Sequence, residues 1–166
     1  MNRIISNTSP IIALSMIGKL NLLWDLFDEV YISTGVYREV FISDEVVLRG
    51  QHELKEAINN GKIKIYEVQD QLLVAKLINK LHRGEVETII GGIELDVDFV
   101  VIDEKAARNQ AINSLLTPLG TIGILRLAKE RKLIGEIREY LDILISEGYR
   151  LSKSIYNRAL ELEAEK

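Results

Sequence analysis

The sequence predicts an α/β fold, a three-layer sandwich in which helices flank a central, mostly parallel sheet. Short runs of branched apolar residues alternate along the chain with longer segments whose apolar residues recur at helical spacing. This alternation is typical of strand–helix–strand crossovers, which build a parallel sheet covered on both faces. The 166 residues contain no linker rich in Pro, Gly or Ser, so we expect a single domain over residues 1–166.

Five short apolar segments are expected to form the sheet. The clearest is the run Phe-Val-Val-Ile, and the run Arg-Ile-Ile-Ser near the N-terminus is a second buried candidate. Another segment alternates apolar and polar residues, as a half-buried strand does. The expected strands are residues 3–6, 30–32, 63–68, 99–102 and 115–119, the last of them interrupted by Pro118.

Capping residues set the expected helix boundaries. Ser9 is expected to cap the first helix, with Pro10 at its first position, and Asn60-Gly61 has the composition of a helix end. Ser33 or Thr34 would cap the third helix. The expected helices cover 10–18, 20–27, 34–41, 51–59, 71–81, 85–95, 105–112, 121–131, 134–146 and 152–163. The helices from about residue 134 carry a surplus of Leu and Ile and are expected to complete the core or form a dimer seam.

Composition narrows the classes of protein that fit. The chain has no cysteine, and its two histidines have no zinc-site spacing, so disulfide scaffolds and thiolate or histidine zinc sites are excluded. No signal peptide or membrane span is evident, and we expect a cytoplasmic protein. The net charge of −4 argues against a surface that coats nucleic acid. The sequence has two basic clusters, Lys80/His82/Arg83 and Arg126/Lys129/Arg131/Lys132. Because runs of charge usually face water, we interpret both as solvated helix ends and not as nucleic-acid contacts.

Two polar residues are expected at the carboxyl ends of strands, where the sites of parallel sheets lie. Asn7 directly follows the first strand, and Asp103 directly follows Phe-Val-Val-Ile. Each also has a structural interpretation: Asn7 as an Asx-type turn, and Asp103 as the N-cap of the helix that follows. Thr8 and Ser9 could donate hydrogen bonds to a phosphate or serve as caps.

Three glutamates are harder to interpret. Glu85 opens a helix, where the helix dipole favours a negative charge and where it could also enter a shared pocket. Glu39 lies within a helix and is indistinguishable from an exposed glutamate by itself. Glu87 lies two residues after Glu85, on a different face of the helix, and is expected at the surface.

Four segments, in order, resemble PIN-domain proteins, in particular a prokaryotic subgroup close to VapC-type toxins. They are Ile4-Ile5-Ser6-Asn7-Thr8-Ser9-Pro10-Ile11-Ile12-Ala13-Leu14, Gly84-Glu85-Val86-Glu87-Thr88, Val101-Ile102-Asp103-Glu104-Lys105-Ala106-Ala107-Arg108, and Gly120-Thr121-Ile122-Gly123-Ile124-Leu125. The resemblance implies a PIN-like fold and a metal-dependent endoribonuclease that hydrolyses phosphodiester bonds in single-stranded RNA. It implies Mg²⁺ or Mn²⁺ as the cofactor, an antitoxin protein as a partner, and a homodimer.

The resemblance also implies roles for individual residues. Glu39, Glu85 and Asp103 match catalytic positions, and Asn7, Glu85 and Asp103 match metal ligands. Asn7, Thr8 and Ser9 fall where substrate would bind. Hard cations prefer such oxygen ligands, and gathered carboxylates repel one another without a cation.

Asn7 departs from the family, which usually has Asp at this position. The amide keeps an oxygen that can bind a hard cation but removes one negative charge. The alternative function is therefore a catalytically attenuated PIN-fold module that binds RNA or protein. An unrelated doubly wound domain that binds nucleotides or accepts phosphate is a third interpretation, and the sequence lacks the glycine-rich phosphate loop that a nucleotide site would use.

Overall fold

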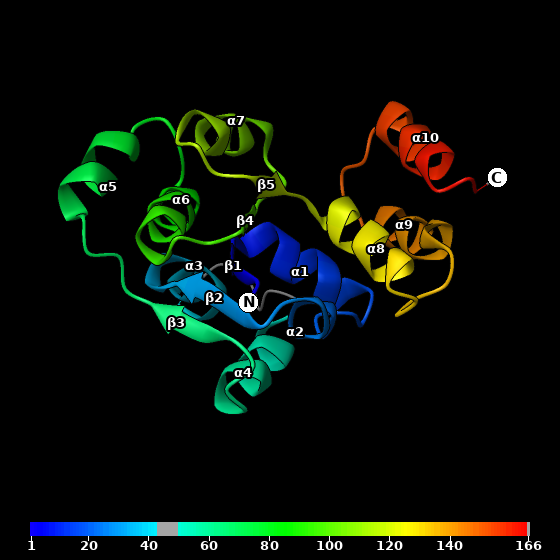
Figure 1. The fold of residues 1–166 in the computed structure, drawn as a ribbon, viewed down its shortest axis with the longest axis horizontal. Coiled ribbons are helices and arrows are strands. Elements are labelled where there is room, and N and C mark those ends of the chain that lie inside the picture. Colours follow the sequence, from blue (N-terminus) through cyan, green and yellow to red (C-terminus); the bar gives the residue numbers. More distant parts are fainter. Residues whose placement is uncertain (43–49, 166) are drawn as a thin grey trace.

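A five-stranded parallel sheet forms the centre of the computed structural model, which describes residues 1–42 and 50–165 (Figure 1). The strand order is β3-β2-β1-β4-β5. The strands are β1 (Arg3–Ser6), β2 (Glu29–Ser33), β3 (Lys64–Tyr66), β4 (Phe99–Val101) and β5 (Pro118–Leu119). With helices on both faces, this architecture confirms the predicted three-layer α/β fold.

Helices account for most of the remaining chain. They are α1 (Thr8–Met16), α2 (Leu22–Leu26), α3 (Thr34–Phe41), α4 (Gln51–Asn59), α5 (Gln71–Leu77), α6 (Arg83–Leu95), α7 (Lys105–Asn113), α8 (Thr121–Glu130), α9 (Ile137–Ser146) and α10 (Lys153–Leu162). Helices α8, α9 and α10 gather at the end of the molecule opposite α5 (Figure 1). Within the described ranges, no helix combines the length and the apolar character needed to cross a bilayer.

Strand β1 divides the core into two layers. Ile4 packs into the cluster that contains residues of α1, α8 and α9, whereas Ile5 packs into the cluster formed with α6 and α7. Val101 and Val100 of β4 separate in the same way. Because successive side chains of a strand point to opposite faces, each strand contributes to both layers.

Helix α6 packs closely on the sheet because it carries two buried glycines. A Cβ atom on Gly91 would lie 2.7 Å from Cδ1 of Ile5, and one on Gly92 would lie 2.7 Å from Cγ1 of Val100. Both distances are shorter than van der Waals contact. The glycine pair therefore brings α6, which carries Glu85, directly against β1 and β4.

Several predicted boundaries were wrong in detail. Helix α1 begins at Thr8 with Asn7 as its N-cap, so Ser9 is not the cap and Pro10 is the third helical residue. This position costs no hydrogen bond, since the first turn of a helix has free N–H groups. The last predicted strand keeps only its end, because the chain turns through Leu115, whose φ is 62°.

Helices α9 and α10 pack on the larger core cluster. Ile137, Leu141 and Leu144 of α9 are fully buried in it, and Ala159 and Leu160 of α10 join them.

The carboxylate of Glu165 ties the end of the described chain to α8 and α9. It accepts the backbone N–H groups of Ile137 and Arg138 at 2.8 and 2.9 Å, and Nζ of Lys129 lies 2.5 Å away. Burial alone would raise the pKa of Glu165, but the ammonium and the two N–H groups outweigh burial and lower it. The charged form therefore stabilises the fold.

Glu165→Gln is expected to lower the free energy of unfolding by about 1 to 3 kcal/mol at neutral pH, because bonds to a charged acceptor become bonds to a neutral amide. Since the folded-state pKa lies below the unfolded value, this stabilisation exists above the ordinary pKa and is lost as pH falls through the folded-state pKa. Urea unfolding across this range checks it. A deficit that persists undiminished in acid would contradict the account, and Glu161→Gln, an exposed residue, is the control.

Candidate functional site

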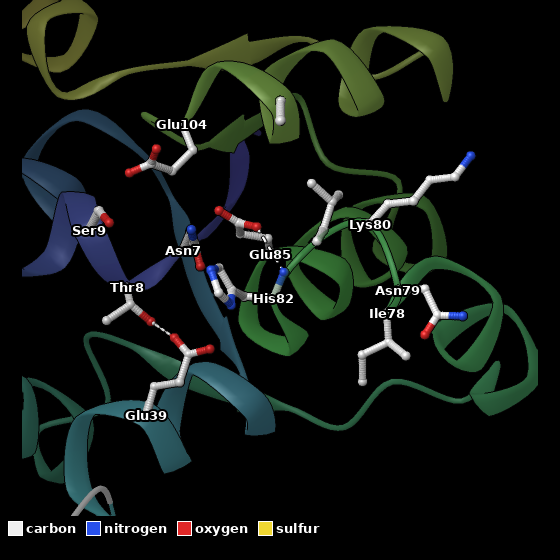
Figure 2. Close-up of a pocket in the computed structure, with 12 residues that line it drawn as sticks. Asn7, Thr8, Ser9, Glu39, Ile78, Asn79, Lys80, His82, Glu85 and Glu104 are labelled. Atoms are coloured by element: carbon white, nitrogen blue, oxygen red, sulfur yellow. Dashed lines mark hydrogen bonds between the residues drawn. The ribbon is translucent and has the colours of Figure 1, made fainter. Parts of the chain in front are cut away.

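The topology places a cavity at the carboxyl ends of β1 and β4. The strand order reverses between these two strands, and such a switch point is where parallel sheets form their sites. The backbone N–H of Asn7 donates to the carbonyl of Val101 at 2.9 Å, so the two strand ends are fixed together. The cavity has a volume of about 840 Å³ (Figure 2). It is lined by Asn7, Thr8, Ser9, Glu39, Ile78, Asn79, Lys80, Leu81, His82, Glu85, Glu104 and Ala106.

The side chain of Asn7 faces this cavity although the residue is only 3% exposed (Figure 2). Its amide oxygen Oδ1 is buried and has no hydrogen-bond partner. Asn7 is the N-cap of α1, yet its side chain makes no capping bond. A buried polar atom without a partner is costly, and it suits a site that an additional electropositive group completes.

Glu85 projects into the same cavity from the first turn of α6 (Figure 2). The residue is 7% exposed, and its Oε2 accepts the backbone N–H of His82 at 3.0 Å. This bond and the positive end of the helix both favour a negative charge at this position. Glu85 therefore stabilises the start of α6 and also lines the cavity.

Glu39 joins three helices through both of its carboxylate oxygens. One oxygen accepts the hydroxyl of Thr8 in α1, and the other accepts the backbone N–H of Gly84 in α6 at 3.0 Å. A Cβ atom on Gly84 would overlap the latter oxygen. Glu39 lines the cavity, but its bonds make it an anchor of the cavity wall, and its catalytic role stays a prediction.

Gly84→Ala is expected to displace the Glu39 carboxylate and lower the free energy of unfolding by about 1 to 2 kcal/mol, because the added methyl group occupies its position. Thermal unfolding measures this as a fall in Tm. The control is Gly135→Ala, where an added Cβ meets no atom within 4 Å. Equal melting of the two variants would show that the Glu39 bonds contribute little.

Asp103 does not line the cavity that Asn7 and Glu85 share. Its Oδ1 accepts the backbone N–H of Thr121 at 2.7 Å, and its Oδ2 accepts the Thr121 hydroxyl at 2.6 Å. It lines a second cavity, beside Tyr149. Burial raises the pKa of the Tyr149 hydroxyl above its ordinary value, and the negative charge of Asp103 raises it further. Asp103 therefore anchors the start of α8, and Glu104, not Asp103, is the N-cap of α7.

Glu104 lines the first cavity instead, although no sequence pattern indicated it as a site residue. Residues 103 and 104 follow β4, and Glu104 has an extended backbone, in which neighbouring side chains point in opposite directions. That alternation is the signal that could have found Glu104. In residues 1–42 and 50–165, no three Asp, Glu or His side chains gather closely enough to hold a metal by themselves.

Glu87 corrects a second expectation, because it is buried and not at the surface. The residue is 4% exposed, and its Oε2 has no hydrogen-bond partner. Burial raises the pKa of Glu87, although Arg83, 4.0 Å away, opposes this. Helix α3 covers it through Gly35, where an added Cβ would overlap that oxygen.

The two basic clusters have different surroundings. Lys80 and His82 line the first cavity, where the ammonium group of Lys80 offsets its carboxylates. In the other cluster, Arg126 pairs with Glu163 at 2.5 Å and Lys129 pairs with Glu165.

A comparison with protein families identifies the family of this chain. The sequence model of a family described as PIN domain matches residues 3–165. The chain belongs to the PIN-domain family. A search of curated proteins and a search of solved structures each returned no match. The PIN domain is a nuclease-type fold whose members generally bind divalent metals and commonly bind RNA.

Proposed function

We propose that this protein is a metal-dependent endoribonuclease of the VapC-like toxin type, which hydrolyses phosphodiester bonds in single-stranded RNA. The observation that carries the proposal is the unpaired amide oxygen of Asn7, which shares one cavity with the Glu85 carboxylate. Membership of the PIN-domain family supports the reaction class.

The residues at this cavity fit Mg²⁺ or Mn²⁺. These hard cations are usually bound by one or two carboxylates, with waters and substrate phosphates filling the other positions. Asn7 and Glu85 offer one amide oxygen and one carboxylate, and Glu104 lines the same cavity. Asp103 is less suited to contribute, since it lines the second cavity and both of its oxygens already accept hydrogen bonds from Thr121. When bound, the cation would polarise a phosphoryl oxygen and lower the pKa of a water.

The remaining lining residues would position the substrate. Lys80 and His82 offer N–H donors for a phosphate at the rim. Ser9 lines the cavity with its hydroxyl, whereas the hydroxyl of Thr8 already donates to Glu39. We therefore assign substrate contact to Ser9 and Asn7, and positioning of the wall to Thr8 and Glu39.

A catalytically attenuated module that binds RNA or protein is the second candidate. Two observations favour it: Asn7 lacks the charge of the usual Asp, and Asp103 is bonded to Thr121 away from the cavity. Such a module would bind metal and RNA without turnover.

Glu85→Gln is expected to reduce cleavage of single-stranded RNA in Mn²⁺ by roughly 100-fold or more, because it removes the buried carboxylate while its amide oxygen can still accept the His82 N–H. A gel assay with a labelled oligonucleotide measures the rate. Glu53→Gln, at an exposed position of α4, is the control. RNA binding without cleavage by the wild-type protein would favour the module, and full cleavage by the Glu85→Gln variant would remove the site assignment.

Asn7→Asp is expected to tighten Mn²⁺ binding roughly tenfold, about 1.4 kcal/mol, because a charged ligand replaces a neutral one. In EDTA the same variant should melt below the wild type, since the introduced carboxylate and Glu85 would repel each other in a buried cavity. Added Mn²⁺ should reverse this order of Tm values by stabilising the folded state. Equal Tm shifts for both proteins would contradict a cation at Asn7.

The oligomer and the partner belong to the same proposal. Exposed apolar side chains on α9, Ile143 and Ile145, support a homodimer. An antitoxin partner rests on the family resemblance alone. Light scattering of the purified chain measures whether it forms a dimer.

A further inference from the structure

The second cavity forms a cleft on the other side of the β4 end. It has a volume of about 600 Å³ and lies among β5, the start of α8, residues 149–151 and α10. The two cavities are lined by adjacent residues, Glu104 in the first and Asp103 in the second. A chain that leaves the first cavity across this loop would therefore enter the cleft.

The cleft concentrates positive charge in a protein whose net charge is −4. Four arginines line it, Arg108, Arg126, Arg150 and Arg158, and Asp103 is the one carboxylate among the described residues that do so. The overall sequence has 25 acidic and 21 basic residues, so this local balance is the reverse of the global one.

Two of the arginines are available to a ligand. Arg108 donates to the carbonyl of Ile102, and Arg126 is paired with Glu163. Among the described residues, Arg158 pairs only with Glu161, at 3.7 Å and with both side chains about 70% exposed, a weak surface interaction. In the described part of the chain, no carboxylate lies within 4.0 Å of the Arg150 guanidinium.

The ten-residue helix α8 adds a positive end to the same cleft. The N-cap Gly120 and the first-turn residues Ile122 and Gly123 line the cleft, and their N–H groups belong to the helix terminus. Asp103 occupies the N–H of Thr121 and leaves the others. Helix termini and arginine forks both favour phosphate oxygens.

We propose that this cleft binds the sugar-phosphate backbone of the single-stranded RNA that flanks the bond at the first cavity. The proposal rests on the proposed function and assigns it a second contact region. Arg150 and Arg158 hold phosphates, and the aliphatic floor, which includes Leu119 and Leu151, offers no stacking platform for bases. Tyr149, the one aromatic residue in the described lining, is half-buried against the core and lies beside Asp103. Binding in the cleft is therefore tolerant of sequence.

Fluorescence anisotropy in EDTA tests this without any cleavage. The probe is a labelled oligouridylate of about twelve nucleotides, titrated between about 50 and 200 mM salt. The double variant Arg150→Gln/Arg158→Gln is expected to bind roughly tenfold more weakly, and the slope of log affinity against log salt should fall by about 1.4, or 0.7 per lost phosphate contact. The control is Arg131→Gln/Lys132→Gln, which removes two exposed cations at the opposite end of α8.

The outcomes separate this proposal from the nuclease assignment. An unchanged salt slope in the cleft variant, or an equal loss in the control, would overturn the cleft. Tighter binding of an oligoglutamate peptide than of RNA, lost in the cleft variant, would also overturn it and assign the cleft to a protein partner. Arginine-dependent RNA binding with no cleavage in Mn²⁺ would support the cleft and remove the nuclease.

Discussion

The central strand β1 imposes the main constraint on this molecule. It pairs in parallel with β2 on one edge and with β4 on the other, and helices cover both of its faces. In parallel sheets that are covered in this way, functional polar residues lie beyond the carboxyl ends of the strands. Asn7 occupies the carboxyl end of β1, bonded through its backbone to the end of β4. The strand order reverses at this pair, so the cavity is a consequence of the topology.

The polar residues around the two cavities fall into two classes. Glu39 and Asp103 use both carboxylate oxygens in bonds to neighbouring helices, which fixes α1, α3, α6 and α8 relative to the sheet. Asn7 has a buried oxygen without a partner, and Glu104 lines the same cavity. The anchored carboxylates thus stabilise the fold, whereas the other polar residues are free to bind a ligand. In our account the anchored carboxylates hold the walls, and the unpaired oxygen is left to bind a cation.

Local sequence patterns predicted the strands and the switch-point position of Asn7 well, because apolar periodicity and chain order determine both. They did not predict which way Asp103 turns. Its partner Thr121 comes 18 residues later, and only the packing of α8 brings it near. Glu87 was expected at the surface because its own helix gave no reason to bury it. Glu87 is covered by Gly35 of α3, and the spacing of residues along one helix cannot predict such a contact with another helix.

The central claim is that a divalent cation binds between Asn7 and Glu85. Paramagnetic broadening by Mn²⁺ in a nitrogen-15 spectrum tests it most directly, since the effect falls steeply with distance from the ion. The account predicts that substoichiometric Mn²⁺ broadens the side-chain amide of Asn7 and the backbone amides of Thr8 and Glu85 more strongly than the Thr121 amide. Broadening centred on Thr121, or no selective broadening at all, would contradict it.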